Sequence, residues 1–169
     1  MLHTKILLAC LGVLIGVGTG ATADWGIRTG VAVPVLAAHE SHSFALTEVT
    51  AYAPVFRPRG WELGLEASAG VLLRHTTPGV LVSLTPTARV HLTEALAVQA
   101  QAGVGYLTRA RYQALDLGGP FVVRPAVGVH YAFSPTLRLE GTWTHLSNAG
   151  IYRDNPGLDL LTVGLRWIW

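Results

Sequence analysis

The sequence predicts an all-β fold, an eight-stranded antiparallel transmembrane β-barrel, and three observations favour it. Apolar and polar residues alternate with a period of two through several stretches of about ten residues or more. Charged residues make up 13% of the chain, whereas about a quarter is usual for a soluble domain. No stretch beyond residue 23 is apolar and long enough for a membrane helix, so we expect the apolar residues to be spread over strands.

Residues 1–23 have the features of a secretory signal peptide, which leaves residues 24–169 as a single barrel domain. A weakly basic start precedes an apolar stretch, and the Ala-Thr-Ala of residues 21–23 forms a small-x-small cleavage site. The alternatives are a membrane anchor, for which the stretch is short, and lipid attachment at Cys10, the one cysteine. Beyond residue 23 the chain has eleven Arg against ten Asp and Glu. That balance gives no basis for nucleic-acid binding.

Eight strands follow in order from the alternation. The clearest begins at Trp61, where odd positions are apolar through Leu73 and most even positions are small or polar. The apolar faces carry Trp, Tyr and Phe at their ends, whereas a soluble sandwich would have shorter strands and a polar exterior. The predicted strands comprise residues 27–36, 45–56, 61–73, 80–90, 96–106, 121–133, 136–148 and 157–169.

An even number of strands with aromatic ends is typical of barrels whose apolar face meets lipid and whose polar face fills a narrow interior. Closure also removes the unpaired edges that such apolar strands would expose. A lipocalin-like soluble barrel with an apolar cup is the alternative. The charged side chains that we expect to pair inside the barrel are Glu62, Glu66, Arg89, Arg124, Arg138, Glu140 and Arg166.

The connections alternate in length, which orients the barrel in its membrane. The tight connections are residues 57–60, 91–94 and 133–136. The longer ones, which alternate with them, are residues 37–43, 107–120 and 148–156, and the connection at 74–78 is intermediate. Because bacterial barrels have short periplasmic turns and longer extracellular loops, we expect both termini in the periplasm. The last eight residues, with Gly164, Trp167 and Trp169, are similar to the signal read by the outer-membrane assembly machinery.

The last predicted hairpin carries polar residues on the face that should meet lipid. His145 and Ser147 share the parity of Trp143, and Asp159 on the partner strand shares the parity of Leu161. These are the residue types of a base, a nucleophile and an orienting acid. A trio that faces the outer leaflet predicts an ester substrate that is itself a lipid of that leaflet.

Donors for a developing oxyanion follow the trio. The side chains of Asn148 and Asn155 and the backbone N–H groups around Gly150 lie within sequence reach. The same residues are also ordinary turn formers. His39 and His42 in the first long connection lack the further ligands of a metal site, so we expect no metal.

The segment Thr144-His145-x-Ser147-Asn148-Ala149-Gly150, followed by Asn155-x-Gly157-x-Asp159, resembles the active-site segment of the outer-membrane lipid A 3-O-deacylases of the PagL type. The resemblance implies hydrolysis of the ester-linked 3-hydroxyacyl chain at the 3-position of lipid A, a carboxylic ester hydrolase activity that uses no cofactor. It implies lipid A of lipopolysaccharide and the lipid bilayer as partners, and the bacterial outer membrane as the location.

The resemblance also assigns roles to residues. It implies that His145 is the catalytic base, Ser147 the nucleophile and Asp159 the acid, which is commonly a Glu in the family. It links Asn155 and Asn148 to the oxyanion hole. Because Asp is one methylene shorter than Glu, Asp154 is the alternative acid.

Other questions stay open at this stage. A non-enzymatic barrel of structural or adhesion type would place the trio apart or in the lumen, and a related barrel could act on phospholipid instead. The sequence leaves the oligomeric state open, a homodimer included. Guanidinium groups expected in outward loops or at strand ends are candidates for contact with lipid A phosphates: Arg74, Arg109, Arg111 and Arg153.

Overall fold

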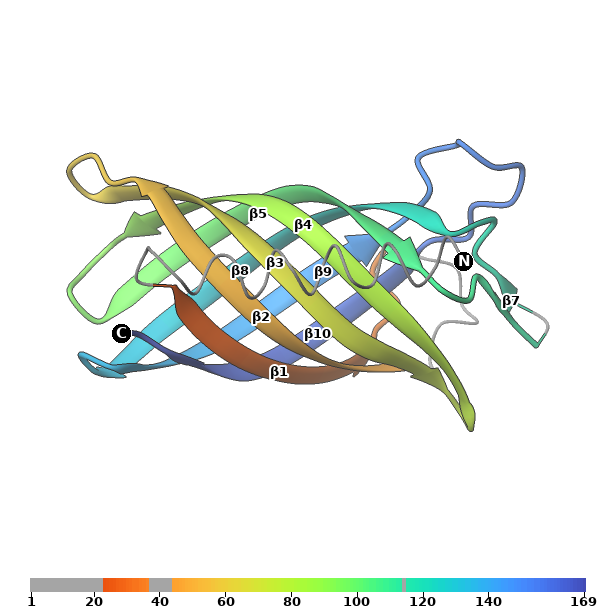
Figure 1. The fold of residues 1–169 in the computed structure, drawn as a ribbon, viewed down its shortest axis with the longest axis horizontal. Coiled ribbons are helices and arrows are strands. Elements are labelled where there is room, and N and C mark those ends of the chain that lie inside the picture. Colours follow the sequence, from red (N-terminus) through yellow and green to blue (C-terminus); the bar gives the residue numbers. More distant parts are fainter. Residues whose placement is uncertain (1–22, 37–43, 114) are drawn as a thin grey trace.

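The computed structural model describes residues 23–36, 44–113 and 115–169, and their main feature is one antiparallel sheet closed on itself (Figure 1). No helix in these residues is long and apolar enough to cross a membrane. The predicted signal peptide lies outside the described residues except for Ala23, and it stays a prediction. The barrel strands are β1 (Asp24–Ala32), β2 (Phe44–Phe56), β3 (Trp61–Arg74), β4 (Thr77–His91), β5 (Leu96–Leu107), β8 (Phe121–Ser134), β9 (Leu137–Leu146) and β10 (Leu158–Trp167).

The strand order confirms the predicted barrel. Each strand pairs with its neighbour in the order β1-β10-β9-β8-β5-β4-β3-β2, and the pairing of β1 with β10 closes the ring. The closing register runs from Trp25 opposite Trp167 to Ala32 opposite Leu160. Because the sheet has no free edge, every strand can satisfy its backbone groups inside hydrocarbon.

Three local features differ from the prediction. The first strand ends at Ala32, short of the predicted residue 36; Pro34 follows, and it has no N–H to donate to a ladder. The connection at 74–78 is a two-residue turn between Arg74 and Thr77, with His75 at a φ of 52°. The long connection after β5 contains a small ribbon of β6 (Arg111–Tyr112) and β7 (Leu115–Asp116).

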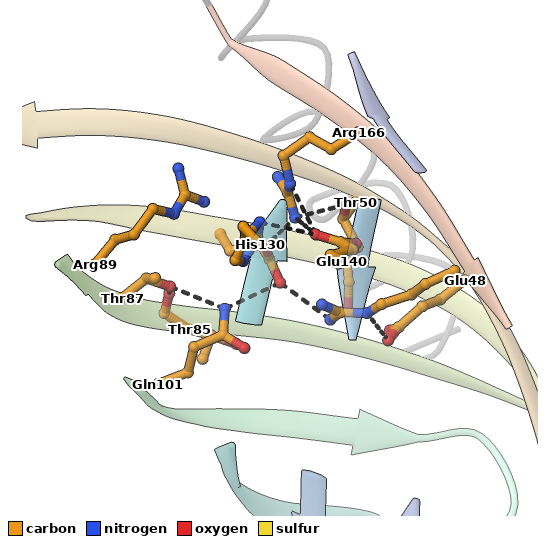
Figure 2. A network of polar contacts seen from close by, with 12 residues as sticks. Glu48, Thr50, Thr85, Thr87, Arg89, Gln101, His130, Glu140 and Arg166 are labelled. Carbon is orange, nitrogen blue, oxygen red and sulfur yellow. Dashed lines mark hydrogen bonds and ion pairs between the residues drawn. The ribbon is translucent and has the colours of Figure 1, made fainter. Parts of the chain in front are cut away.

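The middle of the lumen is filled by paired charges. Glu66 accepts hydrogen bonds from Arg28 at 3.0 Å and from Arg166 at 2.6 Å, and Glu48 binds Arg28 and Arg124. Figure 2 shows part of this network, with Arg166 directed at Glu140 and Gln101 at Thr87. Since a buried charge is costly unless it is paired, this network is what allows a polar lumen.

The predicted interior charges are confirmed with one exception and two additions. Arg138 is only half-buried and forms no ion pair within the described residues. Arg28 and Glu48 are fully buried members of the network that the alternation did not identify. Both lie on the two strands with the least regular alternation, β1 and β2.

The lumen is apolar at the end where β1 and β9 finish and β10 begins. A single cluster of buried apolar side chains fills this end: Ala32, Phe44, Leu46, Leu72, Leu81, Leu107, Tyr112, Leu115, Leu117, Val122, Leu146, Leu158 and Leu160. A fully polar interior was therefore an incomplete prediction. Leu146 and Leu158 anchor the ends of β9 and β10 in this cluster, so their sequence neighbours must face outward.

The charge network generates a stability prediction. Glu66→Gln should lower the free energy of unfolding by about 3–5 kcal/mol, because it leaves the buried guanidiniums of Arg28 and Arg166 without their shared carboxylate. Urea titration of the barrel folded in lipid vesicles measures this. The matched control is Glu94→Gln in an exposed turn, expected to change stability by less than about 0.5 kcal/mol. Equal effects of the two substitutions would contradict the role of the network.

Candidate functional site

The predicted trio lies on the outer wall of the barrel, at the end opposite Trp25 of β1 and Trp167 of β10. His145 and Asp159 are direct cross-strand partners. Ser147 continues the outward face of β9 just beyond the strand, where its backbone bridges to Val123 of β8. The inward positions between them are the anchored Leu146 and Leu158, so the sheet brings the two strand ends together with this face turned out.

The imidazole and the carboxylate are joined by a hydrogen bond. His145 Nδ1 lies 2.8 Å from Asp159 Oδ1. Asp159 is fully buried in spite of its outward parity, because the imidazole lies against it from one side and residues of the chain after β1 from another. With Nδ1 bound to the acid, Nε2 is the nitrogen left to exchange a proton with a substrate or nucleophile. The shorter Asp therefore reaches the imidazole, and Asp154 lies in the exposed loop after β9.

Ser147 is two residues from His145 on the same face, which places their Cα atoms roughly 6–7 Å apart by strand rise. Within the described residues no hydrogen bond joins the two side chains. Contacts between a nucleophile and its base often tighten only when substrate is bound. The arrangement thus offers an imidazole and a carboxylate already paired, with Ser147 two residues further along the same face.

The loop after β9 is held by Asn148, which is fully buried. Its amide nitrogen donates to the carbonyls of Leu117 at 3.1 Å and Asp154 at 2.6 Å, and its amide oxygen accepts from the Gly150 N–H at 2.9 Å. The Ile151 N–H donates to the Asn148 carbonyl across Ala149 and Gly150, which have φ values of 52° and 79°. Asn148 and the Gly150 N–H are therefore engaged in shaping the loop.

Asn155 is oriented by the same loop. Its side-chain oxygen accepts the backbone N–H of Asn148 at 2.9 Å, which fixes the amide so that its NH₂ group points elsewhere. Asn155 is exposed, and the N–H of Ala149 forms no hydrogen bond within the described residues. Of the donors predicted around the oxyanion, these two groups are the ones still free to donate.

A glycine beside the imidazole explains one further motif position. Gly157 has a φ of 70°, a conformation that favours glycine. A Cβ at this position would come within 3.0 Å of the Cε1 atom of His145. Glycine at position 157 therefore permits the turn into β10 and leaves room for the imidazole ring of His145.

An apolar groove on the barrel wall begins next to the trio, at the cross-strand partners Trp143 and Leu161. Its volume is about 580 Å³, and it crosses from β9 over β8, β5 and β4 to the start of β3. Trp143 lines the end of the groove near the trio, and the centre of its ring is 6.5 Å from the centre of the His145 ring. Trp61 lines the opposite end. Gly141, which carries no side chain, leaves the wall open between them. This geometry can hold an extended apolar chain next to the polar trio.

The arginines predicted to face outward divide into three kinds. Arg74 is buried, donates to the Tyr112 carbonyl at 2.6 Å and stacks on Phe44, so its prediction as a surface cation was wrong. It continues the inward parity of β3, a signal that the sequence contained. Arg111 pairs with Asp116 at 3.0 Å. Only Arg109 and Arg153 of the four are exposed without an ion pair in the described part of the chain.

The structure describes only some of the residues on which the expected absence of a metal site depends. His39 and His42 lie outside the described residues. Among those that are described, no group of three or more His, Cys, Asp or Glu side chains could hold a metal ion.

Comparisons of the coordinates with solved structures place the fold among small outer-membrane barrels. A crystal structure of the outer membrane enzyme PagL matches with a TM-score of 0.65 and 15% identity, over 85% of this chain and 97% of that one. A de novo designed transmembrane β-barrel matches with a TM-score of 0.63 and 14% identity, over 88% and 96%. The N-terminal barrel domain of Pseudomonas aeruginosa OprF matches with a TM-score of 0.58 and 15% identity, over 88% and 97%.

The sequence comparisons add the family. A search of curated proteins found no match, whereas the family model described as lipid A 3-O-deacylase (PagL) matches residues 18–167. That span contains the whole barrel up to the end of β10 and every residue of the site described above. The chain therefore belongs to the lipid A 3-O-deacylase (PagL) family, the lipid A hydrolases of the bacterial outer membrane.

Proposed function

We propose that this lipid A 3-O-deacylase cleaves the ester of the 3-hydroxyacyl chain with Ser147 as nucleophile, His145 as base and Asp159 as orienting acid. The observation that carries the proposal is the hydrogen bond between His145 Nδ1 and Asp159 Oδ1 on the outer face of the barrel. A paired imidazole and buried carboxylate beside a serine is the arrangement of a carboxylic ester hydrolase. The homodimer that the sequence leaves open stays a prediction.

The reaction would proceed in two steps. The Ser147 hydroxyl attacks the ester carbonyl and passes its proton to His145 Nε2, while Asp159 stabilises the imidazolium that forms. The tetrahedral oxyanion takes hydrogen bonds from the Asn155 side-chain NH₂ and the Ala149 N–H. The intermediate expels the 3-oxygen of the sugar, which takes the proton back from His145. Water then repeats the sequence on the acyl-serine and releases a 3-hydroxy fatty acid.

The location of the trio supports a membrane lipid as substrate. A soluble ester could not easily reach a wall that faces hydrocarbon, whereas a lipid of the outer leaflet is already there. A non-catalytic barrel would leave these side chains apart or inside the lumen; the His145–Asp159 pair on the outer wall argues against that alternative. The remaining alternative, a phospholipid substrate, uses the same chemistry and differs in the head group.

The groove supports the same substrate class. An ester carbonyl held at Ser147 would direct its acyl chain along the wall past Trp143, since the chain must remain in hydrocarbon. The groove crosses four strand spacings from β9 to β3, roughly 19 Å at about 4.8 Å each. That length is comparable with one leaflet of a bilayer core, roughly 15 Å. We infer that the groove receives the acyl chain that is removed.

The first test is the chemistry itself. Lipid A from cells that express the wild-type chain should lose one 3-hydroxyacyl mass, and cells with Ser147→Ala should retain it, because no other group replaces the attacking oxygen. Mass spectrometry of extracted lipid A measures this. The matched control is Ser134→Ala at the exposed end of β8, which should behave as wild type. Loss of the acyl group in cells with Ser147→Ala would show that Ser147 is not the nucleophile. Cleavage of phospholipid instead of lipid A by the wild-type chain would show that the substrate is a phospholipid.

The second test concerns the groove. Gly141→Val places a branched side chain where an added Cβ meets nothing within 4 Å, so it should fill the groove without disturbing the barrel. We expect the preference for longer over shorter acyl chains, measured as the ratio of kcat/KM values on lipid A variants in mixed micelles, to fall by roughly tenfold or more.

The control for this test is Ala53→Val on β2, which also faces outward but lies off the groove. It should leave the preference unchanged. An unchanged preference with Gly141→Val, in a folded and active barrel, would show that the acyl chain lies elsewhere.

A further inference from the structure

The acid of the site is held from a part of the chain far from the catalytic hairpin. Residues 33–36, which we call the exit segment, leave β1 and pass over the end of β10. The Leu36 N–H donates to Asp159 Oδ2 at 2.5 Å, and the Val33 N–H donates to the Asp159 backbone carbonyl at 2.9 Å. The second carboxylate oxygen thus has a backbone donor while the first binds His145.

The path of the exit segment follows from its sequence and from barrel closure. Ala32 is the last residue of β1 paired with β10, opposite Leu160. Pro34 then stops the ladder, and the Val35 N–H bonds back to the Val33 carbonyl at 3.1 Å in a tight turn. This turn brings the Leu36 N–H onto Asp159, while the Val35 and Leu36 side chains remain exposed at 61% and 69%.

An ordinary structural role does not account for this placement. Val35 and Leu36 bury little of their own surface, so their packing contributes little to the barrel. The Leu36 N–H of the exit segment instead donates to a carboxylate, and a donor on Oδ2 favours the orientation in which Oδ1 faces Nδ1 of His145.

We propose that the Leu36 N–H is a positioning group for the catalytic acid, so that the paired His145 and Asp159 form only when β1 has closed the barrel against β10. The proposal rests on the function proposed above for Asp159. It means that an unclosed chain in the periplasm would have its nucleophile but not its oriented base. Activity against lipid esters would begin with barrel closure in the outer membrane.

The test removes one N–H and keeps the side chain. Nonsense suppression at position 36 with the α-hydroxy acid analogue of leucine replaces the N–H by an oxygen; leucine introduced by the same method is the reference. Leu36→Ala, which keeps the N–H, is the matched control. Each protein is folded in detergent, and its barrel is confirmed by circular dichroism.

Two measurements are made on each protein. The first is the NMR resonance of the proton on His145 Nδ1, assigned by its loss in His145→Gln. The second is kcat and KM for release of 3-hydroxy fatty acid from lipid A in mixed micelles. We expect the α-hydroxy acid to shift or abolish the resonance and to lower kcat by about ten- to a hundredfold, as for the loss of a hydrogen bond to a charged group, with KM unchanged. Leu36→Ala should match the reference.

The outcomes separate this proposal from the function on which it rests. An unmoved resonance in the α-hydroxy acid protein overturns the positioning role, whatever the rate. A rise in KM alone would also overturn it, since that would place the segment in substrate binding. The third outcome is a shifted resonance in the α-hydroxy acid protein while every protein, the reference included, leaves lipid A intact. That result would support the positioning of His145 by the exit segment and overturn the proposed reaction.

Discussion

Closure of the sheet is the constraint on which the rest of this structure depends. In hydrocarbon an unpaired backbone group has no water to bind, so the first and last strands must meet. Here the register from Trp25–Trp167 to Ala32–Leu160 completes the ring. The same pairing ends beside Asp159, and the backbone that leaves β1 contacts that carboxylate. A requirement of membrane folding and the placement of the proposed catalytic acid are thus met by one pair of strands.

The side chains that fill the lumen change in character along the barrel axis. Arginines and glutamates neutralise one another in the middle of the lumen, and apolar side chains fill the end of the lumen nearest the site. Paired charges demand fixed geometry, because each unpaired member would be costly. The apolar cluster holds Leu146 at the end of β9 and Leu158 at the start of β10. His145 and Asp159, the outward residues next to these leucines, are therefore held in position although they lie on a wall that faces lipid.

Most of the fold followed from the sequence because lipid on one side and a polar lumen on the other impose a strict period of two. The alternation failed where that contrast fades. In β2 the inward Leu46 is apolar and the outward Thr47 is polar, so the parity of Glu48 was obscured. The trio and its outward face were predicted from parity and from the family resemblance. The contact of Leu36 with Asp159 was not, because it joins residues 123 positions apart and no local pattern encodes it.

The fold alone does not carry the function. A designed barrel and the PagL enzyme superimpose on this chain about equally well, with TM-scores of 0.63 and 0.65, so the wall of strands does not by itself identify an enzyme. What differs lies in a few side chains at one rim. A buried carboxylate on an outward position is costly in a barrel that only spans a membrane. Its burial between an imidazole and a backbone N–H is accounted for when the site needs a base held in one orientation.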